Sequence, residues 1–162
     1  MPFKGMDRQN YLNKKFNGSE QASKIYEVIN RVGYNIGIHF QFNKIKRTPN
    51  SFASHKLLAL GHKKNKQNQI LESLFYSYFI EGKDIGQIEE LVIIAKHHNL
   101  NEQEANHYLS SIQDKAELLE EAVNAKKMGV KGVPCFIINN KYVLFGAQEK
   151  EKFIDLFNSL AK

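Results

Sequence analysis

Cys135 is the only cysteine of this sequence and its most obvious reactive group, and it directly follows Pro134. A thiolate attacks disulfides, but turnover requires a second cysteine that resolves the mixed disulfide. The sequence contains no Cys-x-x-Cys or Ser-x-x-Cys pair, so we assign no catalytic residue. Cys135 begins the apolar run Cys135–Ile138, where a thiol is normally an inert packing group. We interpret it first as a core residue and second as a weak candidate thiol. The second interpretation is favoured if the strand lies at the edge of its sheet.

Asn50 and His55 are the other polar residues that we single out, and both lie near the start of a predicted helix. Asn50 or Ser51 can cap that helix, and we favour capping over a ligand role for Asn50. His55 is more simply a surface helix histidine than a functional one. None of the six histidines has a metal-type spacing to cysteine or acids, so we predict no metal site.

The elements around Cys135 form a predicted hairpin and helix. Gly129 ends a helix, and Asn139-Asn140 is typical of a tight turn because asparagine tolerates positive φ. The pattern therefore predicts a β-hairpin over 134–145, followed by a helix over 148–160 that lays one apolar face on the sheet. The apolar residues of that face are Phe153, Leu156, Phe157 and Leu160.

The chain before the hairpin reads as almost entirely helical. Apolar spacing and capping residues predict helices that carry Ala22–Val32, Phe52–Ala59, Ile70–Phe79, Ile88–Ala95 and Asn101–Leu109, and a last one that ends at Gly129. For the second of these helices the spacing indicates Phe52, His55, Leu58 and Ala59 as one face. The alternating stretch 38–42 predicts a short extended segment.

The string Gly-Val-Lys-Gly-Val-Pro over 129–134, followed by an apolar strand, resembles the cis-proline motif of the DsbA family of thiol–disulfide oxidoreductases. With Gly146-Ala147-Gln148 it looks most like the cytoplasmic FrnE-type branch. The resemblance implies that Pro134 is a cis-proline and that the backbone of Val133 pairs with a substrate peptide. It also implies that Asn50 and His55 lie near the substrate groove.

Three further strings resemble the same branch and extend the resemblance over nearly the whole chain. They are residues 4–8, residues 47–51 with His55, and residues 78–85. The implied fold is an α/β, thioredoxin-like DsbA-type domain. A mainly helical insertion covers 1–128, and the C-terminal ββα part of the thioredoxin-like domain covers 129–162.

The sequence departs from the family at its beginning, because the first strand and the Cys-x-x-Cys helix of DsbA proteins are not present. We expect an N-terminally incomplete fold whose hairpin edge is open, since two strands alone are marginally stable. The chain is therefore expected to associate, either with a second copy or with a separately encoded N-terminal segment.

Charge is unevenly spread, with 13 Lys or Arg against 3 acids in residues 1–66 and 3 against 11 in residues 67–125. No nucleic-acid motif accompanies the basic part, and no apolar run reaches the ~20 residues of a membrane span. We expect no nucleic-acid or membrane partner. A single cysteine favours a reducing, cytoplasmic location.

Three functions remain open at this point. The first is a DsbA-like protein without autonomous redox activity, whose partners are protein thiols, disulfides or peptides. The second is a relative of the glutathione-dependent 2-hydroxychromene-2-carboxylate isomerases and kappa-class transferases, for which glutathione is the one cofactor to consider. The third is a non-catalytic peptide-binding or interaction module.

Overall fold

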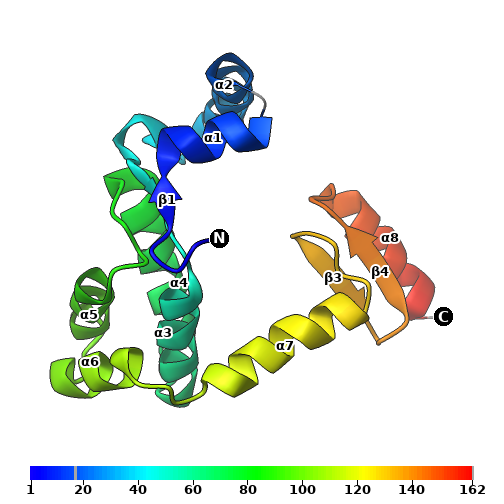
Figure 1. The fold of residues 1–162 in the computed structure, drawn as a ribbon. Coiled ribbons are helices and arrows are strands. Elements are labelled where there is room, and N and C mark those ends of the chain that lie inside the picture. The colour runs from blue at the N-terminus through cyan, green and yellow to red at the C-terminus, as the bar shows by residue number, and fades with distance from the viewer. Residues whose placement is uncertain (17, 162) are drawn as a thin grey trace. The chain divides into compact units, whose positions relative to one another are not determined.

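The computed structural model describes residues 1–16 and 18–161. They form two compact units, Met1–Lys115 and Ala116–Lys162, each with its own two-stranded antiparallel sheet (Figure 1). The predicted division at residue 128 separates an insertion from a thioredoxin-like part. It concerns family architecture rather than compactness, so it stays a prediction. Among the described residues, none of the helices combines the length and apolarity that crossing a bilayer requires.

The first unit is mainly helical. Its elements are β1 (Met6–Asp7), α1 (Arg8–Phe16), α2 (Ser19–Asn35), the 3₁₀ turn η1 (Phe42–Lys44), β2 (Arg47–Thr48), α3 (Phe52–Lys63), α4 (Gln67–Tyr76), the π-helical turn η2 (Ser77–Glu81), α5 (Ile88–His97) and α6 (Glu102–Ser110). Its core lies where α3, α4, α5 and α6 meet, at Leu57, Leu60, Ile70, Leu74, Leu91, Ile94, Ala95, Ala105, Tyr108 and Leu109. The predicted helices are confirmed in type and order.

The face of α3 that we predicted from apolar spacing is wrong. The helix buries Ser54, Lys56, Leu57, Leu60 and Gly61, while His55 is exposed. Gly61 allows α4 to approach closely, because a Cβ there would lie 2.7 Å from Cδ1 of Ile70. The misassignment arose because Lys56 counts as polar in a spacing pattern, although its four-carbon stem packs like an apolar side chain.

The predicted extended segment over 38–42 is not a strand. Phe42 instead begins η1, and the phenylalanines of this stretch join an aromatic cluster. The Phe40 and Phe42 rings stack with centroids 5.1 Å apart, and Tyr26 of α2 lies 4.4 Å from Phe42. Alternating aromatic residues therefore produced a strand-like pattern in a segment that packs irregularly against helices.

The second unit contains α7 (Lys115–Lys127), β3 (Cys135–Ile138), β4 (Tyr142–Phe145) and α8 (Lys150–Leu160). The predicted hairpin and closing helix are confirmed. Asn139 and Asn140 both have φ of 53°, and a type I′ turn requires positive φ at both of its central residues. The Phe136 ring meets Phe153 of α8 edge-on at 4.9 Å, so α8 covers one face of the hairpin (Figure 1).

The second unit contains no fully buried residue among its described positions, in contrast to the helical core of the first. Phe136, Val143, Phe145, Ile154 and Phe157 are all at least 37% exposed. A two-stranded hairpin is marginally stable alone, and here a single helix packs on it without burying any described residue. Its residues are those of a protein interior, but they lie at the surface.

Candidate functional site

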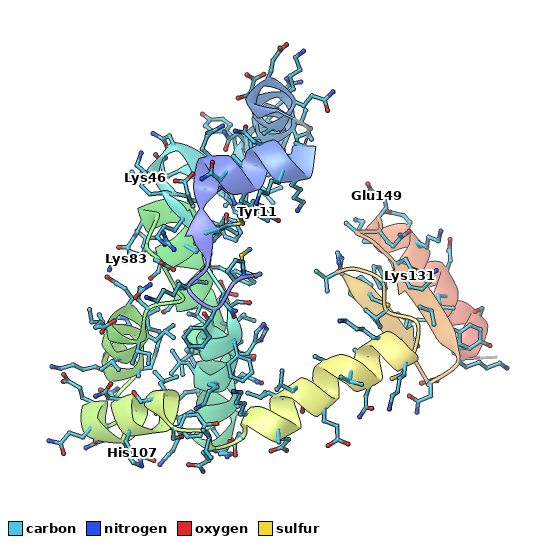
Figure 2. The ribbon with its side chains drawn as sticks, viewed as in Figure 1. Tyr11, Lys46, Lys83, His107, Lys131 and Glu149 are labelled. Atoms are coloured by element: carbon cyan, nitrogen blue, oxygen red, sulfur yellow. The ribbon has the colours of Figure 1, made fainter. Side chains whose placement is uncertain are left out.

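The loop between α7 and β3 carries the predicted peptide-docking residues. Gly129 ends the α7 region at φ 85°, and Lys131 follows it in the loop (Figure 2). Val133 is 91% exposed, and Pro134 is exposed as well. The Val133–Pro134 peptide bond is cis, and the carbonyl oxygen of Pro134 accepts a hydrogen bond from the Gly146 N–H at 2.8 Å.

That last hydrogen bond fixes which way each backbone group of β3 points. In an antiparallel ladder, successive residues direct their N–H and C=O alternately toward and away from the partner strand. Since Pro134 faces β4, the register places Phe136 and Ile138 toward β4 as well. Cys135 and Ile137 then direct both backbone groups to the opposite edge. Val133 precedes the strand across the cis peptide bond, so this alternation does not extend to it.

The outer edge of β3 is open within the part of the chain that the structure describes. β3 pairs with β4 alone, and no hydrogen bond reaches the backbone of Cys135 or Ile137 from outside the hairpin. The outer edge of β4 differs, because Gln148 donates its side-chain N–H to the Phe145 carbonyl at 2.6 Å. The outer edge of β3 is therefore the more open of the two, since one outward carbonyl of β4 already has a partner.

Cys135 lies at the start of this open edge. Its thiol is free and half-buried, and it pairs across the hairpin with Phe145. An edge position is the condition under which the sequence favoured Cys135 as a candidate thiol. A thiol there can form a mixed disulfide, but the chain offers no second cysteine to resolve it.

Asn50 and His55 belong to the first unit, whereas Val133 and Pro134 belong to the second. Oδ1 of Asn50 accepts the Phe52 N–H at 3.0 Å, and its Nδ2 donates to the Pro2 carbonyl at 3.3 Å. Asn50 therefore accepts the first helical N–H from the position before Ser51, which is the N-cap residue and makes no side-chain capping bond of its own. His55 is exposed on α3, and its place in a substrate groove stays a prediction.

The three family-like strings of the first unit meet at one junction. β1 and β2 pair with Met6 opposite Thr48, and Arg47 donates to the Lys4 carbonyl at 2.6 Å. Arg47 also forms an ion pair with Asp84 at 3.2 Å. Sequence reasoning missed these two-residue strands, because they lie 40 residues apart and carry no periodicity.

Arg8 is the polar centre of this junction. Its guanidinium donates to Tyr26 at 2.6 Å, to Thr48 at 3.2 Å and to the Tyr78 hydroxyl at 3.3 Å. Burial raises the pKa of Tyr78, although the Arg8 charge opposes the shift. The phenol therefore stays neutral and serves as a hydrogen-bonding partner.

Lys56 is the second polar residue that the sequence did not reveal. It is 1% exposed, and its ammonium donates to the carbonyls of Tyr108, Leu109 and Ser111 at 2.6, 3.3 and 2.7 Å. Those carbonyls end α6, where a cation suits the helix dipole. Burial lowers the pKa of Lys56, and the Asp114 carboxylate partly opposes this. The geometry is that of a structural clamp.

A serine–histidine pair lies between α4 and the end of α5, with Ser73 Oγ 2.7 Å from Nε2 of His98. Burial, followed by the charges of His97 and Lys66, lowers the pKa of His98, so its ring is neutral at pH 7. Acyl-transfer chemistry also needs an orienting group and oxyanion donors. Within residues 1–16 and 18–161 no carboxylate bonds to the His98 ring. The pair ties α4 to α5.

Comparison with known proteins identifies one family model, described as a DSBA-like thioredoxin domain, which matches residues 1–158. No curated protein matches the chain. A "probable DsbA oxidoreductase" from Streptomyces coelicolor has a similar structure, with 22% identity and a TM-score of 0.83 over 95% of this chain and 67% of that one. A "putative protein disulfide isomerase" from Nitrosomonas europaea follows at 16% identity and a TM-score of 0.67, over 86% of this chain and 73% of that one.

These likenesses establish the fold. It is a mixed α/β, DsbA-like thioredoxin fold with a C-terminal hairpin and helix, as the sequence predicted. At such identities the solved structures carry no further statement about activity, which has to be argued from the residues of this chain.

Proposed function

Because the chain belongs to the DSBA-like thioredoxin domain family, we propose that it holds extended peptide segments of thiol-bearing proteins at the Val133–Pro134 loop. In this proposal it catalyses no disulfide exchange by itself. The family's activity requires two cysteines, and the chain has one. What it retains is a surface on which a peptide backbone can pair.

The open edge of β3 is the observation that supports the proposal. Val133 is 91% exposed and directly precedes Pro134 and this edge. An extended peptide adds to such an edge through main-chain hydrogen bonds, which give affinity with little dependence on sequence. The half-buried thiol of Cys135 follows two residues later and would be close to a cysteine in the bound segment.

An insulin-reduction assay with dithiothreitol tests the absence of exchange activity. The purified chain is expected to leave the rate of insulin precipitation at that of dithiothreitol alone, because no resolving cysteine is present. An accelerated rate would refute this part of the proposal. The Cys135→Ser variant serves as the control that traces any acceleration to the chain's own thiol.

Peptide binding is tested by fluorescence anisotropy with a labelled, reduced and unfolded cysteine-containing peptide. We expect saturable binding that weakens in the Val133→Pro variant, since proline removes the N–H with which the peptide backbone is proposed to pair. Val143→Pro removes an outward N–H from the other edge of the hairpin and should bind normally. Equal binding by both variants would place the peptide elsewhere.

Glutathione is the second candidate ligand, because its peptide backbone can pair non-covalently with the open edge beside the free Cys135 thiol. This alternative places the chain with the glutathione-dependent isomerases and transferases. Titration calorimetry with reduced glutathione separates the two ideas. Binding of glutathione without peptide binding would favour the alternative.

The finer family assignment is part of the same proposal. We assign the chain to the FrnE-type branch on its four strings, and to a reducing cytoplasmic compartment on its single cysteine. A separately supplied N-terminal segment that brings a cysteine pair would complete the exchange chemistry. Translation of the DNA upstream of Met1 would show whether such a segment is encoded there.

A further inference from the structure

The two residues that direct their backbone groups to the open edge of β3 lie symmetrically about Phe136. Cys135 and Ile137 direct their backbone groups outward and flank Phe136 evenly. A second copy of β3 that runs antiparallel can therefore place Cys135 opposite Ile137 and Ile137 opposite Cys135. All four outward N–H and C=O pairs of the two strands would then be satisfied by four hydrogen bonds.

We propose that two copies of this chain pair through β3, around a two-fold axis at Phe136, to form a four-stranded sheet in the order β4-β3-β3-β4. Isologous pairing of this kind is self-complementary and closes at two copies. It turns a two-stranded hairpin, which is marginally stable by itself, into a four-stranded sheet. It also places a second hairpin against a unit in which no described residue is buried.

The composition of β3 favours this occupant. The strand Cys-Phe-Ile-Ile carries no charge, lysine or proline of the kind that normally protects an edge from pairing. The alternative edge on β4 is partly closed, because Gln148 already occupies the outward carbonyl of Phe145. Residues 126–162 hold 7 Lys against 3 acids. The two hairpins therefore repel weakly, and added salt should strengthen the dimer by screening this repulsion.

The pairing goes beyond the proposed function and would regulate it. Val133 lies two residues before Cys135, at the start of this edge, so a second copy on β3 would obstruct a peptide held at the Val133–Pro134 loop. The dimer does not depend on peptide binding, and its test contains no peptide. A monomeric chain that still binds peptide would refute the dimer alone, whereas a dimer without peptide affinity would refute the proposed function alone.

Light scattering coupled to gel filtration, over a wide range of concentration and at two salt concentrations, measures the association. The full chain is expected to give twice its 18.7 kDa mass, while Ile137→Pro is expected to give the monomer. Proline at an outward-facing edge position removes one donor to the partner without touching the β3–β4 bonds. Val143→Pro, with the same kind of change on the other edge, should remain dimeric. A wild-type monomer at every concentration would overturn the proposal.

Cysteine cross-linking tests the register in a hairpin that carries no new proline. In the proposed register, residue 136 faces its own copy in a non-hydrogen-bonded pair, where Cα atoms lie about 4.5 Å apart and a disulfide fits. Phe136→Cys combined with Cys135→Ser should form a covalent dimer under mild oxidation. The wild-type chain should not, because Cys135 faces Ile137. Ready cross-linking through Cys135, or none through residue 136, would refute this register.

Discussion

Replacing Lys56 by methionine tests whether the buried ammonium stabilises the first unit. Methionine keeps the length and apolar character of the lysine stem but removes all three N–H donors. The carbonyls of Leu109 and Ser111 lose the contacts at 3.3 and 2.7 Å. The carbonyl of Tyr108 loses one at 2.6 Å but keeps the Ser111 hydroxyl at 2.8 Å. The substitution therefore acts on the C-terminal end of α6.

The expected cost is about 2 kcal/mol. A buried acceptor that loses its partner costs about 1–3 kcal/mol, and loss of the cation at the helix end adds up to about 1 kcal/mol. Part of this is offset, because the ammonium no longer has to be desolvated. Lys56→Ala should cost about 1–2 kcal/mol more, since it also leaves a cavity in the core.

Lys63 provides a matched control on the same helix. Its ammonium pairs with Asp114 at 2.5 Å and lies 5.6 Å from the Tyr108 ring, but its side chain is 50% exposed. Lys63→Met should cost less than about 1 kcal/mol, as exposed ion pairs do. Urea unfolding followed by circular dichroism measures both variants. If Lys56→Met is as stable as the wild type, desolvation cancels the hydrogen bonds and the clamp interpretation is wrong.

The pH dependence of the same comparison has a defined sign. Burial lowers the pKa of Lys56 in the folded state, so the unfolded chain binds the proton more tightly. Stability rises with pH wherever the unfolded state holds more protons. The unfolding free energy of the wild type should therefore rise relative to that of Lys56→Met as pH rises through the lowered pKa toward the ordinary lysine value of about 10.4. A difference that shrinks over this alkaline range would contradict the assigned burial.

Three further predictions concern the first unit and use urea unfolding as the measurement. Gly82→Ala should cost about 2 kcal/mol more than Gly37→Ala, because both have positive φ but only the Gly82 Cβ would meet the Lys44 backbone, at 2.6 Å; equal costs would refute the close approach. Arg8→Lys should cost about 1–2 kcal/mol, since an ammonium cannot span three hydroxyls; no loss would contradict its place at the junction. Hydrogen bonds from Lys63 and Tyr108 lower the pKa of Asp114, so the wild type should exceed Asp114→Asn in stability at neutral pH and lose that advantage as pH falls below about 4. An advantage that persists in acid would refute the bonding.

The parts of the fold that the sequence predicted are those with a local signal. The Asn139-Asn140 turn, the apolar strands beside it and the capped helices each depend on residues within a few positions of one another. The hairpin therefore agrees with the structure to within one residue at its strand ends. Resemblance to a family supplied the fold name, which periodicity alone could not have given.

The parts that the sequence did not predict depend on residues far apart. Arg8 bonds to Thr48 and Tyr78, which lie 40 and 70 positions away, and Lys56 reaches carbonyls 52 to 55 positions away. Polar residues at such separations leave no periodic pattern. The spacing rule also treats a lysine as exposed, which is why it indicated His55 and missed Lys56.

The candidate site divides in the same way. That Val133 lies just before a strand follows from the local pattern, and the structure agrees. Its 91% exposure is known from the structure alone. The direction of each backbone group of β3 does not follow from composition. It required one hydrogen bond, from Gly146 to Pro134, to set the parity of the whole strand. An alternation shifted by one residue would have directed the backbone groups of Phe136 to the open edge and those of Cys135 toward β4.

The position of the family-like strings indicates what they are for. Gly5 lies where a Cβ would meet the Thr48 carbonyl at 2.6 Å, and Gly82 lies equally close to Lys44. Arg8 joins the same junction through the Thr48 hydroxyl, and Arg47 joins it through the Lys4 carbonyl and the ion pair to Asp84. Each string therefore carries residues that this packing requires. A chain can keep all of them and yet have no exchange activity, because the scaffold and the cysteine pair are specified by different residues. The strings support the fold, and the activity has to be judged at Cys135 and along the edge of β3.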